Sequence, residues 1–241
     1  MKNFTWICQH YFKRNVLVPA NLLLIGLPLV FLFAFTLIDQ FLLSQGAQSF
    51  ISFDGVAIPM VLGFLFFGTD ITGNRLHDDL KGSVGARLLV TGIDKRTFFL
   101  TVTVAGWIYL FVMGMLLVAI ASLLFDGVWG SYAMVMVVIL LLALLTQLIG
   151  VIIFYFTKDK KSSARISYLF GEVFIGLSIF PYVINFGETI TTILNHSPVG
   201  IGVQAIKADS FVGVLPNLGM LLGYILVMIM AVLTVGRRKE Q

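Results

Sequence analysis

Long apolar runs alternate along the chain with shorter polar segments. A helix needs about 20 mostly apolar residues to cross a bilayer, and six of the runs reach or approach that length. The pattern therefore predicts an all-α membrane protein with six transmembrane helices. The predicted spans are residues 16–38, 55–69, 97–125, 132–156, 166–186 and 211–235.

Three prolines and Asp70 bear on how the predicted spans bend or end. Membrane helices tolerate proline, so Pro19 and Pro28 are compatible with the first span. Pro181 is expected to break the fifth span. Asp70 follows the apolar part of the second span, and we expect it to close that span as a boundary residue.

Two further segments are apolar without being long enough to cross the membrane. Residues 1–15 place Phe4, Ile7 and Tyr11 at helical spacing next to Trp6 and basic residues, which predicts an amphipathic interfacial helix. The alternative is a frayed polar leader. Residues 187–210 are too apolar for a free loop and too short to span twice, so we expect a broken, re-entrant or interfacial segment outside the cell.

Composition agrees with this architecture. The chain is 59% hydrophobic and 12% charged, whereas soluble domains carry roughly 25% charged residues. No segment is polar enough to form a separate soluble domain, so residues 1–241 are expected to form one transmembrane domain. Cys8 is the only cysteine, which excludes an intramolecular disulfide and a multi-cysteine metal site.

The basic residues predict the orientation of the spans. With six spans, all but one of the 16 Lys and Arg residues fall on one side of the membrane, and Lys207 is the exception. The positive-inside rule then places both termini and residues 70–99 in the cytoplasm. The net charge of +4 follows from this rule and gives no reason to expect nucleic-acid binding.

Motifs of common enzymes are absent from the sequence. It contains no G-x-x-x-x-G-K-[ST] phosphate loop, no H-E-x-x-H zinc motif and no G-x-S-x-G nucleophile elbow. His10, His77 and His196 lie in separate polar segments on both predicted sides, so no shared metal site is expected. We therefore expect a non-catalytic chain that does not itself hydrolyse ATP.

Residues 70–99 form the only long polar interruption of the apolar pattern. Leu76, Leu80, Val84 and Leu88 recur every fourth position, which predicts one apolar face on a cytoplasmic helix. Such a helix is suited to docking on a soluble partner. The alternative is an interfacial helix that only connects the second and third spans.

This segment resembles the corresponding segment of type II ABC exporter permeases. Members of that family carry an acidic residue, then basic-Gly-Thr-Leu, Arg-Leu-Leu and Thr-Pro after their second span. The present chain has Asp78, then Lys-Gly-Ser-Val at 81–84, Arg-Leu-Leu at 87–89 and Thr-Gly at 91–92. It departs from the family in having Asp for Glu, Ser-Val for Thr-Leu and Gly for Pro. The layout is also similar, including Ser197-Pro198 near the end of the external segment.

The resemblance implies a complex in a bacterial plasma membrane. Two six-span subunits, identical or paralogous, would each bind a separate ATPase subunit, which would hold the ATP and Mg; the present chain would bind no cofactor. Residues 70–99 would contain the coupling helix that enters a cleft of the ATPase. Its candidate contact residues are Asp78, Asp79, Leu80, Lys81, Val84, Arg87, Leu88 and Leu89.

The expected substrate is amphipathic or hydrophobic, because the spans contain no ordered array of polar groups. An antimicrobial or toxin peptide, or a drug, is the first candidate on family resemblance, and a lipid or polysaccharide is the alternative. A secondary transporter would require paired polar residues within two or more spans. A membrane enzyme would require a clustered acid, base or metal set.

Glu172 is the candidate residue for the transport pathway. It lies within the fifth span, where an ionisable side chain is costly unless it is paired or hydrated. It either faces a cationic substrate or a partner's Lys or Arg, or it pairs with Arg165 or another basic residue at the cytoplasmic boundary. In the sixth span, Gly219 and Gly223 are spaced so that another helix can approach closely.

Overall fold

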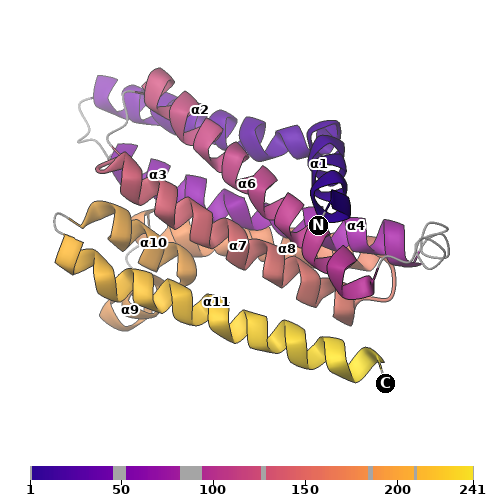
Figure 1. The fold of residues 1–241 in the computed structure, drawn as a ribbon. Helices are drawn as coiled ribbons and strands as arrows, with labels where there is room; N and C mark the ends of the chain where they lie inside the picture. The colour runs from indigo at the N-terminus through magenta and orange to yellow at the C-terminus, as the bar shows by residue number, and fades with distance from the viewer. Residues whose placement is uncertain are drawn as a thin grey trace.

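The computed structural model describes residues 2–45, 53–81, 94–125, 129–183, 187–208 and 211–240. The described residues are almost entirely helical and contain no strand (Figure 1). Six helical stretches are long and apolar enough to cross a membrane, which confirms the predicted number of candidate spans. They are Leu23–Ser44, Val56–Leu80, Arg96–Leu124, Tyr132–Phe156, Lys160–Phe180 and Val212–Arg237.

The described elements are helices throughout. They are α1 (Lys2–Val16), η1 (Pro19–Leu22), α2 (Leu23–Ser44), α3 (Phe53–Phe64), η2 (Leu65–Gly68), α4 (Thr69–Leu76), η3 (His77–Lys81), α6 (Lys95–Phe125), α7 (Tyr132–Phe156), α8 (Lys160–Val183), α9 (Glu188–Asn195), α10 (Pro198–Lys207) and α11 (Phe211–Glu240).

Two of the candidate spans form the centre of the bundle. Inside the molecule, 89% of the most apolar window of α3–α4 and 72% of that of α7 are buried, against 11% for α2 and for α11. Helix α7 packs against α4, α6, α10 and α11, and α3 packs against α8. Helices α2 and α11 therefore present most of their apolar side chains outward, as expected for helices that face lipid.

The second span does not end at Asp70, contrary to the sequence-based prediction. Helix α3 continues without a break through the 3₁₀ turn η2, helix α4 and the π-helical turn η3 to Lys81. Two polar groups in this stretch find partners on α7: Thr72 donates to Gln147, and Gln147 donates to the carbonyl of Gly68 at 3.1 Å. These hydrogen bonds join the stretch to α7 beyond the point where the apolar run ends.

The first span begins later than predicted. After α1 the chain forms a short turn and the 3₁₀ helix η1, which contains Pro19, so the long helix α2 starts at Leu23 and ends at Ser44. The side-chain amide of Asn21 donates to the backbone carbonyl of Asn15 at 2.8 Å, which fixes this turn. The apolar residues at 16–22 belong to the turn and not to the span.

The fifth span begins earlier than predicted, because the basic segment before it is helical. Asp159 accepts hydrogen bonds from the backbone N–H and the hydroxyl of Ser162, at 2.8 and 2.9 Å, and so caps the first turn of α8. The helix then runs to Val183, two residues beyond Pro181. The proline therefore lies in the last turn and does not interrupt the helix before that point.

The segment between the last two spans consists of two short helices, α9 and α10. Ser197 accepts a hydrogen bond from the N–H of Gly200 at 3.0 Å, and Pro198 occupies the first turn of α10. Most of α10 is buried against α7, α11 and α3. The chain thus changes from α9 to α10 at residues 196–197, while the re-entrant or interfacial position of these helices relative to a membrane stays a prediction.

Helix α1 lies across the direction of the long helices (Figure 1). It packs against α6, and both it and the last turns of α11 lie at the end of the bundle that contains α4. Helices α9 and α10 lie at the opposite end. The two ends of the described chain are therefore on the same side, as an even number of spans requires.

Candidate functional site

The carboxylate of Asp79 joins the end of the second span to helix α1. It accepts a hydrogen bond from the hydroxyl of Tyr11 at 2.6 Å and two from Nη1 of Arg14 at 2.8 and 3.0 Å. The side chain of Asp79 is only 3% exposed, so its carboxylate is largely removed from water, whereas the side chain of Arg14 is 35% exposed. A buried carboxylate is costly unless it is paired and hydrogen-bonded, and here it is both.

Arg75 fastens the same two helices one turn earlier. Its Nε donates to the side-chain oxygen of Asn15 at 3.1 Å, and its Nη2 donates to the backbone carbonyl of Arg14 at 3.1 Å. The last carbonyls of a helix have no partner within the helix. Arg75 therefore also satisfies the C-terminal end of α1.

Asp78 and His77 connect the same turn to the loop between α7 and α8. Asp78 accepts from Nζ of Lys160 at 2.9 Å and lies 3.9 Å from Nη2 of Arg14. The hydroxyl of Thr157 donates to the carbonyl of Ile153, so it accepts from Nε2 of His77 at 2.8 Å. The His77 ring also packs edge-on against Phe154.

We refer to the residues of these contacts as the helix-end cluster, which comprises Tyr11, Arg14, Arg75, His77, Asp78, Asp79, Thr157 and Lys160. Burial, together with the hydrogen bond to Asp79, raises the pKa of the Tyr11 phenol far above its ordinary value. Burial opposes the charge of Arg14, but the hydrogen bonds and negative charge of Asp79 outweigh it and raise its pKa. The cluster is therefore a fixed ion-pair network at neutral pH.

The predicted ATPase-contact residues fall into three groups. Asp78 remains partly exposed, with 28% of its side chain accessible. The side chain of Asp79 is largely buried, and its carboxylate accepts hydrogen bonds from Tyr11 and Arg14. Leu80 is partly buried and packs against an apolar group that includes Ile7 and Leu76.

The remaining predicted contacts lie at or beyond the end of the described segment 53–81. Lys81 is described only as the last residue of η3. The other four predicted contacts lie outside the described residues: Val84, Arg87, Leu88 and Leu89. The apolar stripe from Leu76 to Leu88 is thus observed only in its first half, as a continuation of the second span rather than as a separate helix.

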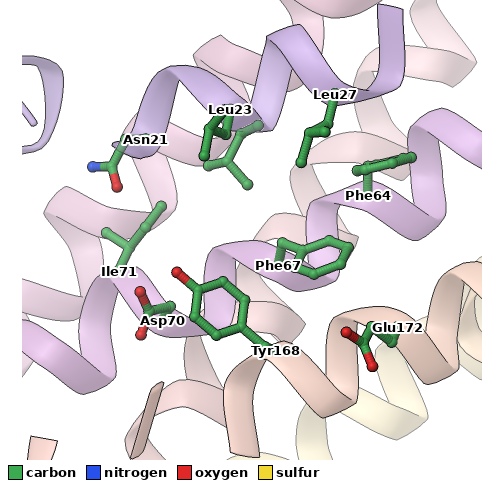
Figure 2. Close-up of a pocket in the computed structure, with 10 residues that line it drawn as sticks. Asn21, Leu23, Leu27, Phe64, Phe67, Asp70, Ile71, Tyr168 and Glu172 are labelled. Atoms are coloured by element: carbon green, nitrogen blue, oxygen red, sulfur yellow. The ribbon is translucent and has the colours of Figure 1, made fainter. Parts of the chain in front are cut away.

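A second polar feature is a cavity of about 270 Å³ on the side of the bundle, which we call the lateral cavity (Figure 2). It lies between η1–α2, α3–α4 and α8. Its walls are mostly apolar and aromatic, with two carboxylates, a phenol and an amide among them. The lining residues are Asn21, Leu23, Leu24, Leu27, Phe64, Phe67, Asp70, Ile71, Tyr168 and Glu172.

The lateral cavity changes the interpretation of two acidic residues, Asp70 and Glu172. Asp70 is not a boundary residue, because it lies within the continuous helix and contributes to the cavity wall. Glu172 is exposed at the same cavity, and no ion pair between it and Arg165 is present among the described residues.

Sequence reasoning missed the partners that give both sites their geometry. Tyr11 and Arg14 contact Asp79 across 68 and 65 residues of chain, and no local pattern links such positions. In the sequence, the one signal that Asp70 lies inside a helix is the helical pattern that continues through residues 70–81. From the sequence alone, that pattern predicts a separate helix.

Comparisons with known proteins give no further assignment. No protein-family model matches the chain, and no curated protein matches it significantly. The fold and the two polar features described above are therefore the basis for a functional proposal.

Proposed function

We propose that this chain is the membrane-spanning permease subunit of an ABC exporter in a bacterial plasma membrane. Two such subunits, identical or paralogous, would work with two separate ATPase subunits that bind ATP and Mg. The transported substrate would be amphipathic or hydrophobic, with a peptide or drug as the first candidate and a lipid or polysaccharide as the alternative. The proposal combines the resemblance of residues 78–92 to the family with six candidate spans.

The observation that carries the proposal is the helix-end cluster. The last turn of the second span is joined to α1 through Asp79 and Arg14, and to the start of α8 through Asp78 and Lys160. A displacement of this turn therefore moves three elements at once. A subunit driven by a soluble motor needs such a rigid connection at the point where the motor binds.

The contacts suggest how the movement would reach the spans. ATP-driven closure of the ATPase pair would displace residues 82–93, which follow directly on the helix-end cluster. Because α4 is continuous with α3, the displacement would tilt the central span as a rigid body. The Asp78–Lys160 pair would transfer part of it to α8, and the nucleotide would thereby bias one of two arrangements of the spans.

The first experiment is co-purification with the ATPase encoded beside the gene for this chain. We expect the wild-type chain to retain the ATPase and the Arg87→Glu/Leu88→Arg variant to lose it. Arg237→Glu, a charge reversal in the last helix, is the matched control and should retain it. A wild-type chain that purifies alone and transports without ATP would contradict the proposal.

A second experiment separates docking from transmission. Lys160→Ala breaks the contact with Asp78 and leaves every candidate ATPase-contact residue unchanged. We expect this variant to retain the ATPase and to lose part of the ATP-driven transport in proteoliposomes. If it transports at the wild-type rate, the Asp78–Lys160 contact does not transmit the movement.

One observation favours a second candidate function. Asp70 and Glu172 belong to two different spans and line the same cavity, and paired polar residues within two spans are typical of secondary transporters. An ion-gradient-driven transporter of cations is therefore the alternative. It predicts uptake or efflux in proteoliposomes that follows an imposed proton or sodium gradient and does not require an ATPase.

A further inference from the structure

The lateral cavity has an unusual combination of walls for a site within a membrane span. Leu23, Leu27 and Ile71 provide aliphatic surface, and Phe64 and Phe67 provide aromatic surface. Figure 2 shows Asp70, Tyr168 and Glu172 along one side of the cavity, with Asn21 on the opposite helix. A ligand in this space would meet apolar surface and negative charge together.

The negative charge of the cavity has no positive counterpart among the lining residues. The lining contains two carboxylates and no Lys, Arg or His. One oxygen of Asp70, Oδ1, is fully buried and has no hydrogen-bond partner among the described residues. Asp70 lies ten residues before Leu80, or about 15 Å along the helix, so it is well inside the candidate span Val56–Leu80. A carboxylate within a span is costly unless it is paired or hydrated, and the cavity lining itself supplies no cation.

The type of compensating cation follows from the walls. Hard metal ions prefer six or more oxygen ligands, and no group of three acidic or His and Cys side chains that could hold a metal is found in the described part of the chain. An organic ammonium or guanidinium group needs fewer oxygen partners. It also interacts favourably with aromatic faces such as those of Phe67 and Tyr168.

We infer that the lateral cavity binds the amine or guanidinium group of an amphipathic cation, with Asp70 and Glu172 as the charge partners. A volume of about 270 Å³ is at the small end for ligand pockets. It therefore accommodates the cationic group and the adjoining carbon atoms, while the rest of the molecule lies along the exposed faces of Leu23, Leu27 and Tyr168. The ligand reaches the cavity from the side of the bundle.

This inference deepens the proposed function by naming the substrate class, and its physiological meaning rests on that function. The binding step does not depend on ATP or on the ATPase. Binding and ATPase capture can therefore be measured separately, and failure of one leaves the result for the other intact.

The test is a fluorescence titration of the purified full chain in phosphatidylcholine nanodiscs. The probe is monodansylated 1,5-diaminopentane, which has an apolar aromatic body and one primary amine. Its N-acetylated form has the same body without the charge and serves as the matched ligand control. Zwitterionic lipid keeps the probe from collecting on an anionic membrane surface.

We expect the amine probe to bind the wild-type chain and the acetylated probe not to bind. Asp70→Asn and Glu172→Gln should each weaken binding about tenfold or more, because a hydrogen-bonded charge partner is lost. Glu188→Gln removes an exposed carboxylate from α9, away from the cavity, and should leave binding unchanged. Thermal unfolding and gel filtration check that all variants are folded.

Three results would overturn the inference. The first is equal binding of both probes, which would mean that the body and not the charge is recognised. The second is that Glu172→Gln binds the amine probe with wild-type affinity. Glu172 is exposed, so its substitution is the least expected to disturb folding. The third is no binding of the amine probe together with weaker self-association of Glu172→Gln, which would identify the cavity as a contact for a second copy of the chain.

Discussion

At the scale of single residues, neighbouring side chains of the same type have different roles. Asp78 and Asp79 are adjacent in the sequence, yet the side chain of Asp78 is 28% exposed and that of Asp79 is 3% exposed. Asp78 pairs with Lys160, which is itself mostly accessible. Exposed pairs contribute little to stability, whereas a buried carboxylate depends strongly on its partners.

The difference predicts unequal effects of two matched substitutions. Asp79→Asn removes the charge that holds Arg14 and weakens the acceptor of the Tyr11 hydroxyl, so we expect a loss of about 1–3 kcal/mol in the free energy of unfolding. Asp78→Asn should cost less than about 1 kcal/mol. Thermal unfolding of both variants in the same detergent measures the difference. Equal losses would contradict the assignment of Asp79 as the buried member.

At the scale of elements, the continuity of α3, η2 and α4 depends on a close approach of α7. A Cβ atom added at Gly150 would collide with the backbone carbonyl of Thr69. The absence of a side chain at this position lets α4 and α7 pack at backbone distance. The same contact region contains the hydrogen bonds of Gln147 to Thr72 and Gly68.

Gly150→Ala is therefore expected to push the two central helices apart. Overpacking against a backbone that cannot move aside costs about 1–3 kcal/mol, which should lower the unfolding temperature clearly. Gly219→Ala is the matched control, because nothing lies within 4 Å of the added atom. An alanine in a helix is favoured over glycine by about 0.5–1 kcal/mol, so the control should be neutral or slightly stabilised. A stable Gly150→Ala chain would contradict the close packing.

At the scale of the whole molecule, the helix-end cluster and the lateral cavity lie on the same two helices. Asp70 precedes Asp78 by eight residues on the second span, or about 12 Å, and Glu172 follows Lys160 by about 18 Å on α8. The Asp78–Lys160 contact thus joins the ends of the two helices that carry the cavity carboxylates. A movement at this end would change the relative position of Asp70 and Glu172.

The orientation of the molecule in a membrane is a further prediction at this scale. Lys158 follows Thr157 of the helix-end cluster in the chain, and Glu188 is the first residue of α9, which lies at the end of the bundle opposite α4 (Figure 1). In a Cys8→Ser background, an impermeant maleimide added to intact cells should label Glu188→Cys. It should label Lys158→Cys only after lysis. Labelling of both positions in intact cells would contradict six spans with cytoplasmic termini.

The sequence alone determined the helical class and the number of candidate spans, because apolar length is a local property of the chain. The fourth span, Tyr132–Phe156, was predicted with both of its ends, since polar residues and glycine bound its apolar run. The amphipathic pattern of residues 1–15 also predicted a separate helix, which is observed as α1.

The tertiary structure alone decided where the second span ends, which carboxylate is buried, and that Asp70 and Glu172 line one cavity. Each of these depends on partners far away in the chain, such as Tyr11 and Arg14 for Asp79. A polar residue ends an apolar helix when it faces water, but it continues the helix when other helices satisfy it. Packing supplies those partners, and no local pattern of residues specifies them.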